Sequence, residues 1–138
     1  YEHRHFFPFF DRLVLAQRAN ADMILGDTPF YEKLKLGGAN TVRGLAAAHL
    51  RAQGRLLFNS ELRWRGLQLP GKQAIFTGLL LFWDIGRVFE PEAQISWGQW
   101  RNATGVGLRF HWHSTIVRAD YGKSGSRTGL YITFSQVF

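Results

Sequence analysis

The feature that most constrains this chain is an alternation of polar and apolar side chains with a period of two residues. Between residues 55 and 65, odd positions are mostly arginine, asparagine and glutamate, whereas even positions are leucine, phenylalanine, serine and tryptophan. Successive side chains of a β-strand point to opposite faces of the sheet, so this segment predicts a strand with one charged and one apolar face. The same pattern is found in residues 12–23, 73–89, 101–113, 115–121 and 129–138, and residues 1–9 are a candidate seventh strand.

The predicted strands are long, and most of them span 9–13 residues. Strands of soluble proteins usually have about 5–6 residues, whereas a tilted membrane-spanning strand needs about 9–11. Turn-like segments lie at residues 66–72, 90–99 and 122–128. One connection, from Gly26 to about Gly54, is much longer and shows no clear alternation, which is typical of a functional or disordered loop.

Composition excludes several classes of protein. The 138-residue chain has no cysteine, so it holds neither a disulfide framework nor a thiolate metal site. Its longest apolar stretch, residues 78–83, is far shorter than the roughly 18 residues that a membrane helix needs. No signal peptide is visible and the sequence opens at Tyr1, so we interpret it as a processed or truncated piece of a longer protein.

The net charge of +7 raises the question of a nucleic-acid partner. A nucleic-acid-binding face would be mainly basic. Here the polar faces mix both signs, with Arg18 near Asp22 and Glu61 near Arg63. Mixed charges are typical of the lumen of a barrel, and we therefore expect no nucleic acid among the partners.

Alternation alone does not distinguish a membrane barrel from a soluble β-domain, because both have two-faced strands. Aromatic residues on the apolar faces, near the ends of the predicted strands, favour a membrane barrel with an interfacial girdle. These residues are Trp64, Trp83, Trp112, Tyr121 and Phe138. The pattern still leaves open a soluble basic β-domain that binds nucleic acid or a lipophilic ligand.

The long connection carries the motif that narrows these alternatives. Residues 29–45 read PFYEKLKLGGANTVRGL, which resembles the loop signature GG…(V/L)RG(F/Y) of the bacterial surface antigen family. This superfamily of outer-membrane barrels includes BamA, TamA and the two-partner secretion transporters. The matching residues are Gly37, Gly38, Thr41, Val42, Arg43 and Gly44. Leu45 departs from the pattern, because the family usually has an aromatic residue there.

Further segments match strands of the same family in the same order. They are FNSELRW at 58–64, LFWDIGRVF at 81–89 with an F-x-D-x-G core, GVGLRF at 105–110, VRADYG at 117–122 and the terminal YITFSQVF. Each match is weak alone, but five in a fixed order make the resemblance specific over nearly the whole chain.

The resemblance implies a fold and a site. Family members have a 16-stranded antiparallel transmembrane β-barrel, so residues 1–138 would be its C-terminal part, with six to seven strands and the loop at 26–54 directed into the lumen. Such a sheet is incomplete or is completed by another chain, because a closed barrel needs at least about eight strands. Within the lumen, Arg43 is expected to meet Asp84, with Glu61 close by.

The resemblance also implies a function in the bacterial outer membrane, namely inserting or translocating client proteins through a lateral seam. Phe134 and Phe138 would belong to the seam strand and its terminal signal. The expected partners are outer-membrane lipid, client outer-membrane or secreted proteins, and the missing barrel half or a second chain. A transport pore or a membrane anchor for a passenger domain is the alternative.

Motifs of enzymes are absent from the sequence: it contains no GxSxG, no P-loop and no paired-carboxylate arrangement. His3 and His5, like His111 and His113, are spaced as an H-x-H pair that can bind zinc on a strand. No third ligand is evident, so we interpret them as lumen or rim histidines. We therefore expect no enzymatic activity, no metal and no cofactor.

Overall fold

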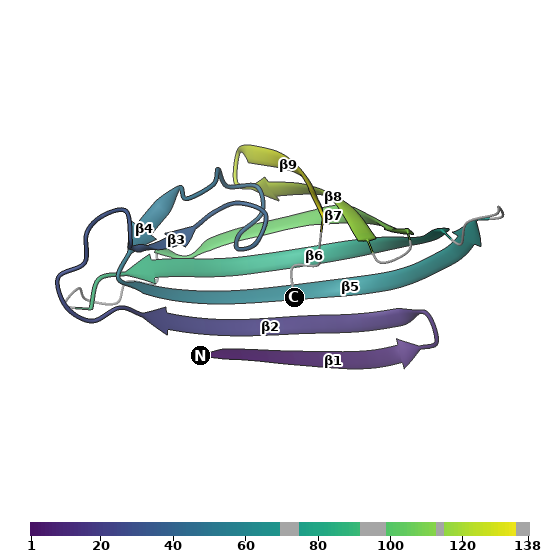
Figure 1. The fold of residues 1–138 in the computed structure, drawn as a ribbon, viewed down its shortest axis with the longest axis horizontal. Helices are drawn as coiled ribbons and strands as arrows, with labels where there is room; N and C mark the ends of the chain where they lie inside the picture. Colours follow the sequence, from purple (N-terminus) through teal and green to yellow (C-terminus); the bar gives the residue numbers. More distant parts are fainter. Residues whose placement is uncertain (70–74, 92–98, 113–114, 135–138) are drawn as a thin grey trace.

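Seven strands form one antiparallel sheet in the computed structural model, which describes residues 1–69, 75–91, 99–112 and 115–134. In spatial order they are β1 (Glu2–Phe10), β2 (Leu13–Met23), β5 (Gly54–Leu69), β6 (Ile75–Phe89), β7 (Arg101–Trp112), β8 (Thr115–Ser124) and β9 (Arg127–Phe134). Each strand pairs with the next one in this order, so β1 and β9 are the two edges (Figure 1). No helix in the described ranges is long and apolar enough to cross a membrane.

The all-β antiparallel prediction is confirmed, and the candidate seventh strand is β1. Two predicted turns are too long. β5 continues to Leu69, and β8 and β9 extend into the segment 122–128 until only Gly125 and Ser126 separate them. Pairs such as Ser124 with Arg127 are held by backbone hydrogen bonds, which need no apolar side chain. The strands therefore extend beyond the last residues that show the hydrophobic alternation.

The long connection contains regular structure that its sequence did not predict. β3 (Leu34–Leu36) and β4 (Leu50–Ala52) pair antiparallel as a separate two-stranded sheet. Strands of three residues are too short to show an alternation that can be recognised.

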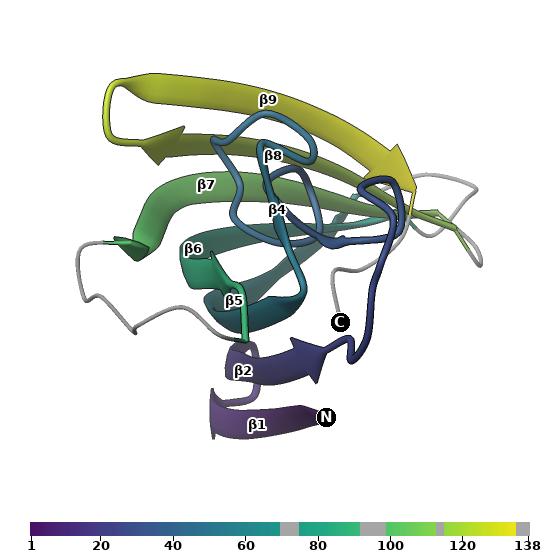
Figure 2. The same ribbon diagram turned by 90° about the vertical axis from the view of Figure 1, so that its left-hand side faces the viewer.

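The large sheet curls from β1 to β9, and the connection between β2 and β5 lies on its concave side (Figure 2). We call this concave side the inner face and the opposite side the outer face. Side chains alternate between them as predicted: Leu108 is 44% exposed on the outer face, and the neighbouring Arg109 is 4% exposed on the inner face. Trp64, Trp83 and Tyr121 are also exposed on the outer face. Trp83 was expected near the end of a strand, but it lies in the middle of β6.

An apolar cluster attaches the connection to the inner face. It consists of Leu36, Val42 and Leu45 from the connection with Leu57 and Ala103 from the sheet. Gly86 gives them room, because a Cβ there would lie 2.8 Å from a methyl carbon of Leu36. Burying an aliphatic side chain contributes about 1.5–3 kcal/mol, so these residues stabilise the loop on the sheet.

Candidate functional site

Arg43 is the centre of the site, and its side chain is completely buried between the connection and the inner face. Its Nε and Nη2 donate to the two carboxylate oxygens of Asp84 on β6, both at 2.8 Å. Its Nη1 donates to Glu61 Oε1 on β5 at 2.6 Å, and its backbone N donates to Asp84 at 3.1 Å. One guanidinium therefore bridges carboxylates of two adjacent strands, with the two-pronged geometry that arginine offers a carboxylate.

The guanidinium is also fixed from its flat side. The Arg43 Cζ lies 3.5 Å from the centroid of the Phe82 ring, which is within the range of a cation–π contact. Burial alone would lower the pKa of Arg43, but the hydrogen bond and charge of Asp84 and the charge of Glu61 outweigh it and raise the pKa. The arginine is thus a permanent positive charge that is held in one orientation.

The carboxylates around Arg43 have further partners. Asp84 accepts a hydrogen bond from Asn59 at 2.7 Å, and Glu61 pairs with Arg63 at 2.7 Å. Asp120 on β8 lies 3.6 Å from Arg43 and pairs with Arg109 and Arg118. The inner face therefore carries a continuous network of buried charges that extends from β5 to β8. Buried carboxylates of this kind are stable only when they are paired.

Backbone carbonyls of the loop are bound by other side chains of the sheet. Arg18 on β2 donates to Asn40 O at 2.8 Å, and Asn59 on β5 donates to Thr41 O at 2.8 Å. From the opposite side, Arg118 on β8 donates to Ala39 O at 3.2 Å. These bonds attach the backbone of the loop to three strands of the sheet.

The loop tip also reaches β9. The hydroxyl of Tyr131 accepts a hydrogen bond from Gly44 N at 3.0 Å and donates one to Leu45 O at 2.7 Å. Gly44 has φ +98°, and a Cβ there would lie 2.9 Å from the backbone N of Ser124. A glycine is required at this position, because the loop turns in the left-handed region against the backbone of β8.

The comparison with known families agrees with this geometry. A family model described as the Omp85 superfamily domain matches residues 1–135. The chain belongs to the Omp85 superfamily. This confirms the resemblance to the superfamily of BamA and TamA, and members of this superfamily are outer-membrane proteins. A comparison with curated proteins found no match.

Within this Omp85 domain, the structure brings together the residues that the loop motif singled out. Arg43 contacts both expected carboxylates, Asp84 and Glu61. Gly37 has φ +113°, and its backbone N donates to Thr41 Oγ1 at 2.8 Å, so it shapes the turn that presents Arg43.

The remaining motif residues lie around this turn or outside the site. Gly38 has φ +101° and accepts a backbone hydrogen bond from Thr41. Val42 belongs to the apolar cluster, as does Leu45, which fills the position where an aromatic residue was expected. Phe134 is 72% exposed at the end of β9 and does not belong to the Arg43 network. Phe138 lies outside the described residues.

Sequence reasoning did not single out several participants of the site, among them Asp120, Arg118 and Tyr131. Arg118 and Asp120 alternate with apolar residues in the predicted strand 115–121 and therefore share its polar face, which is a usable signal that they could pair. Tyr131 also fell on the polar face of its strand, but a hydroxyl that bonds backbone atoms 86 and 87 residues away leaves no pattern in the sequence.

The side chains of the site are mainly arginines and carboxylates bound to one another, an arrangement that positions the loop on the sheet. Across the described ranges, no group of three or more histidine, cysteine, aspartate or glutamate side chains could hold a metal ion. His3 and His5 are exposed; the ring of His3 stacks with Tyr1 and that of His5 with Phe7. His113 lies outside the described residues.

Proposed function

We propose that this Omp85 domain is the C-terminal part of an outer-membrane barrel that inserts or translocates other proteins through a lateral seam. The observation that carries the proposal is a loop locked by Arg43 onto the inner face of a sheet whose last described strand, β9, pairs on one side only. A sheet with this edge offers backbone donors and acceptors to a further strand.

The proposed mechanism is strand addition. A client strand pairs with the free edge of β9 through backbone hydrogen bonds and is then released into the membrane. In lipid an unpaired backbone group costs several kcal/mol, which favours pairing with any strand presented there. For the same reason we propose that a missing barrel half or a second chain pairs with β1. The function involves no cofactor and no enzymatic step.

Site-specific crosslinking tests this proposal. The full-length protein would be reconstituted in liposomes with a client outer-membrane protein, carrying a cysteine at Leu130 on β9 or, as the control, at Leu108 in the central strand β7. Both side chains are exposed on the outer face, at 69% and 44%. We expect crosslinks to the client from position 130 and not from position 108, together with folding of the client.

Equal crosslinking from both positions would contradict the proposal that clients pair at the edge of β9. Ion conductance without any client folding would instead assign the domain to the alternative, a transport pore. A passenger domain encoded upstream of the chain would assign it as a membrane anchor.

A further inference from the structure

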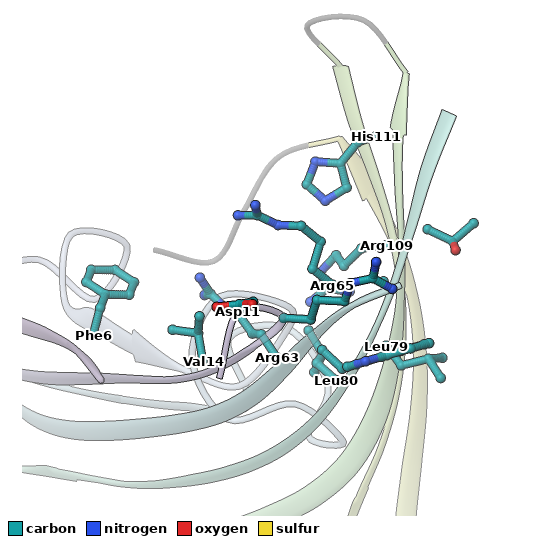
Figure 3. Close-up of a pocket in the computed structure, with 13 residues that line it drawn as sticks. Phe6, Asp11, Val14, Arg63, Arg65, Leu79, Leu80, Arg109 and His111 are labelled. Carbon is teal, nitrogen blue, oxygen red and sulfur yellow. The ribbon is translucent and has the colours of Figure 1, made fainter. Parts of the chain in front are cut away.

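A cavity of about 270 Å³ opens on the inner face at the end of the sheet away from the loop. It lies between the β1–β2 turn, which carries Asp11 and Arg12, and the strands β5 to β7 (Figure 3). Arg43 itself does not line the cavity, but Glu61 and Asp120, which contact Arg43, also pair with the lining residues Arg63 and Arg109. The cavity is therefore a neighbour of the loop lock that shares two carboxylates with it.

The floor of the cavity is a glycine between two arginines. Arg65 on β5, Gly78 on β6 and Arg109 on β7 lie directly opposite one another in the sheet register, so all three face inward. Neighbouring strands are about 4.8 Å apart, which separates the two arginine backbones by roughly 10 Å. Because Gly78 has no side chain, the space between the two arginines stays open for a ligand.

The lining has more positive than negative charge. Four arginines and one aspartate line it: Arg12, Arg63, Arg65, Arg109 and Asp11. Glu61 offsets Arg63, and Asp120 offsets Arg109 but is shared with Arg118. In the described part of the chain, Arg12 and Arg65 make no ion pair, and the buried Nε of Arg109 has no hydrogen-bond partner. Like charges gathered this closely favour the binding of an anion.

Apolar side chains beside the arginines indicate what carries that anion. Phe6, Val14 and Leu80 line the same cavity, so a bare inorganic ion would leave part of it unfilled. A carboxylate between two guanidiniums, next to an apolar side chain, uses both parts of the lining. Such a combination is found in a polypeptide segment in which acidic and apolar residues alternate.

We propose that this cavity binds carboxylate groups of a polypeptide segment, with Arg65 and Arg109 as the principal ligands and Arg12 at the rim. The inference depends on the proposed function only in naming a client chain as the source of the segment. It accounts for part of the chain's positive charge by polypeptide binding, without a nucleic-acid partner.

Fluorescence anisotropy on the full-length protein in lipid nanodiscs tests the proposal. The probe is a labelled octapeptide of alternating glutamate and phenylalanine, compared with its lysine–phenylalanine counterpart and with a single-stranded DNA octamer. We expect the acidic peptide to bind more tightly than both, and its affinity to fall as salt rises. Arg65→Gln should weaken it about tenfold, the equivalent of one charge-assisted hydrogen bond.

The matched control is Arg101→Gln, which removes one arginine charge at the opposite end of the sheet, where the side chain is exposed. It should leave the affinity for the acidic peptide unchanged. Equal binding of both peptides, equal losses in the two variants or preference for the DNA would each overturn the proposal. Client folding in liposomes is measured in parallel. If the protein folds clients but does not bind the acidic peptide, the cavity proposal is refuted and the proposed function is not.

Discussion

The ion pair of Arg43 with Asp84 gives the sharpest test of the loop lock. Both side chains are completely buried, and two side-chain hydrogen bonds of 2.8 Å join them. Charge-assisted hydrogen bonds contribute about 1.5–3 kcal/mol each. Removing one partner of a buried pair destabilises a protein by about 3–5 kcal/mol, because the other charge stays buried without compensation. We therefore expect Arg43→Ala and Asp84→Ala each to lower the free energy of unfolding by about 3–5 kcal/mol.

The double variant Arg43→Ala/Asp84→Ala shows whether the two single variants lose the same interaction or two independent ones. Once Arg43 is gone, Asp84 keeps only Asn59 among the side-chain partners described here, so removing Asp84 as well should add little. The coupling energy of the cycle should be about 2–3 kcal/mol. The measurement is equilibrium unfolding by urea in phospholipid vesicles, followed by tryptophan fluorescence.

The control is Asp22→Ala, which removes the partner of Arg55 at the end of the sheet. These side chains are 20% and 27% exposed, so the loss should be about 1 kcal/mol or less. A coupling energy below about 0.5 kcal/mol between Arg43 and Asp84, or a control as damaging as the buried variants, would refute the loop lock.

Three further outcomes are expected. Tyr131→Phe should lower the free energy of unfolding by about 1–3 kcal/mol in the same urea assay, because two loop backbone groups lose their partner. A nitroxide at Leu108 should be quenched by lipid-soluble oxygen and one at Arg63 should not; the reverse would exchange the two faces. The hydrogen bond from Lys33 lowers the pKa of Glu90, so the tether between them holds above the ordinary carboxyl pKa of 4.5 and is lost as pH falls below it. Relative to the intrinsic exchange rate at each pH, the protection of amides near Lys33 from hydrogen exchange should fall in acid, and Glu90→Gln should abolish that dependence.

The strands and their faces could be predicted because each face meets a different environment. Arg109 and Leu108 are neighbours in sequence, yet one is buried in the charge network and the other is exposed on the outer face. A period of two residues records this difference directly. The strand ends could not be predicted, because pairs such as Lys123 with Thr128 are joined through their backbones and either residue type occurs in turns as well.

The candidate site could be predicted only where side chains meet side chains within a known motif. Arg43 and Asp84 are 41 residues apart, and the resemblance to a barrel family was needed to pair them. Bonds that end on the backbone, such as those of Arg18 to Asn40 O and Tyr131 to Leu45 O, carry no signature in the identity of the accepting residue. Bonds of this type attach the loop to the two sides of the sheet.

The loop holds the strands of the sheet with unequal strength. At β5 and β6 its contacts are buried and charge-assisted, through Glu61 and Asp84. At β9 they are the two neutral hydrogen bonds of Tyr131 and an exposed contact between Arg127 and His49, which solvent weakens. Neutral bonds contribute about 0.5–1.5 kcal/mol each, roughly half as much as charged ones. The edge strand β9 can therefore separate from the loop while Arg43 stays bound to the centre of the sheet. Opening at β9 would then precede any movement of the loop, and in Tyr131→Phe hydrogen exchange should accelerate in β9 but not at Arg43.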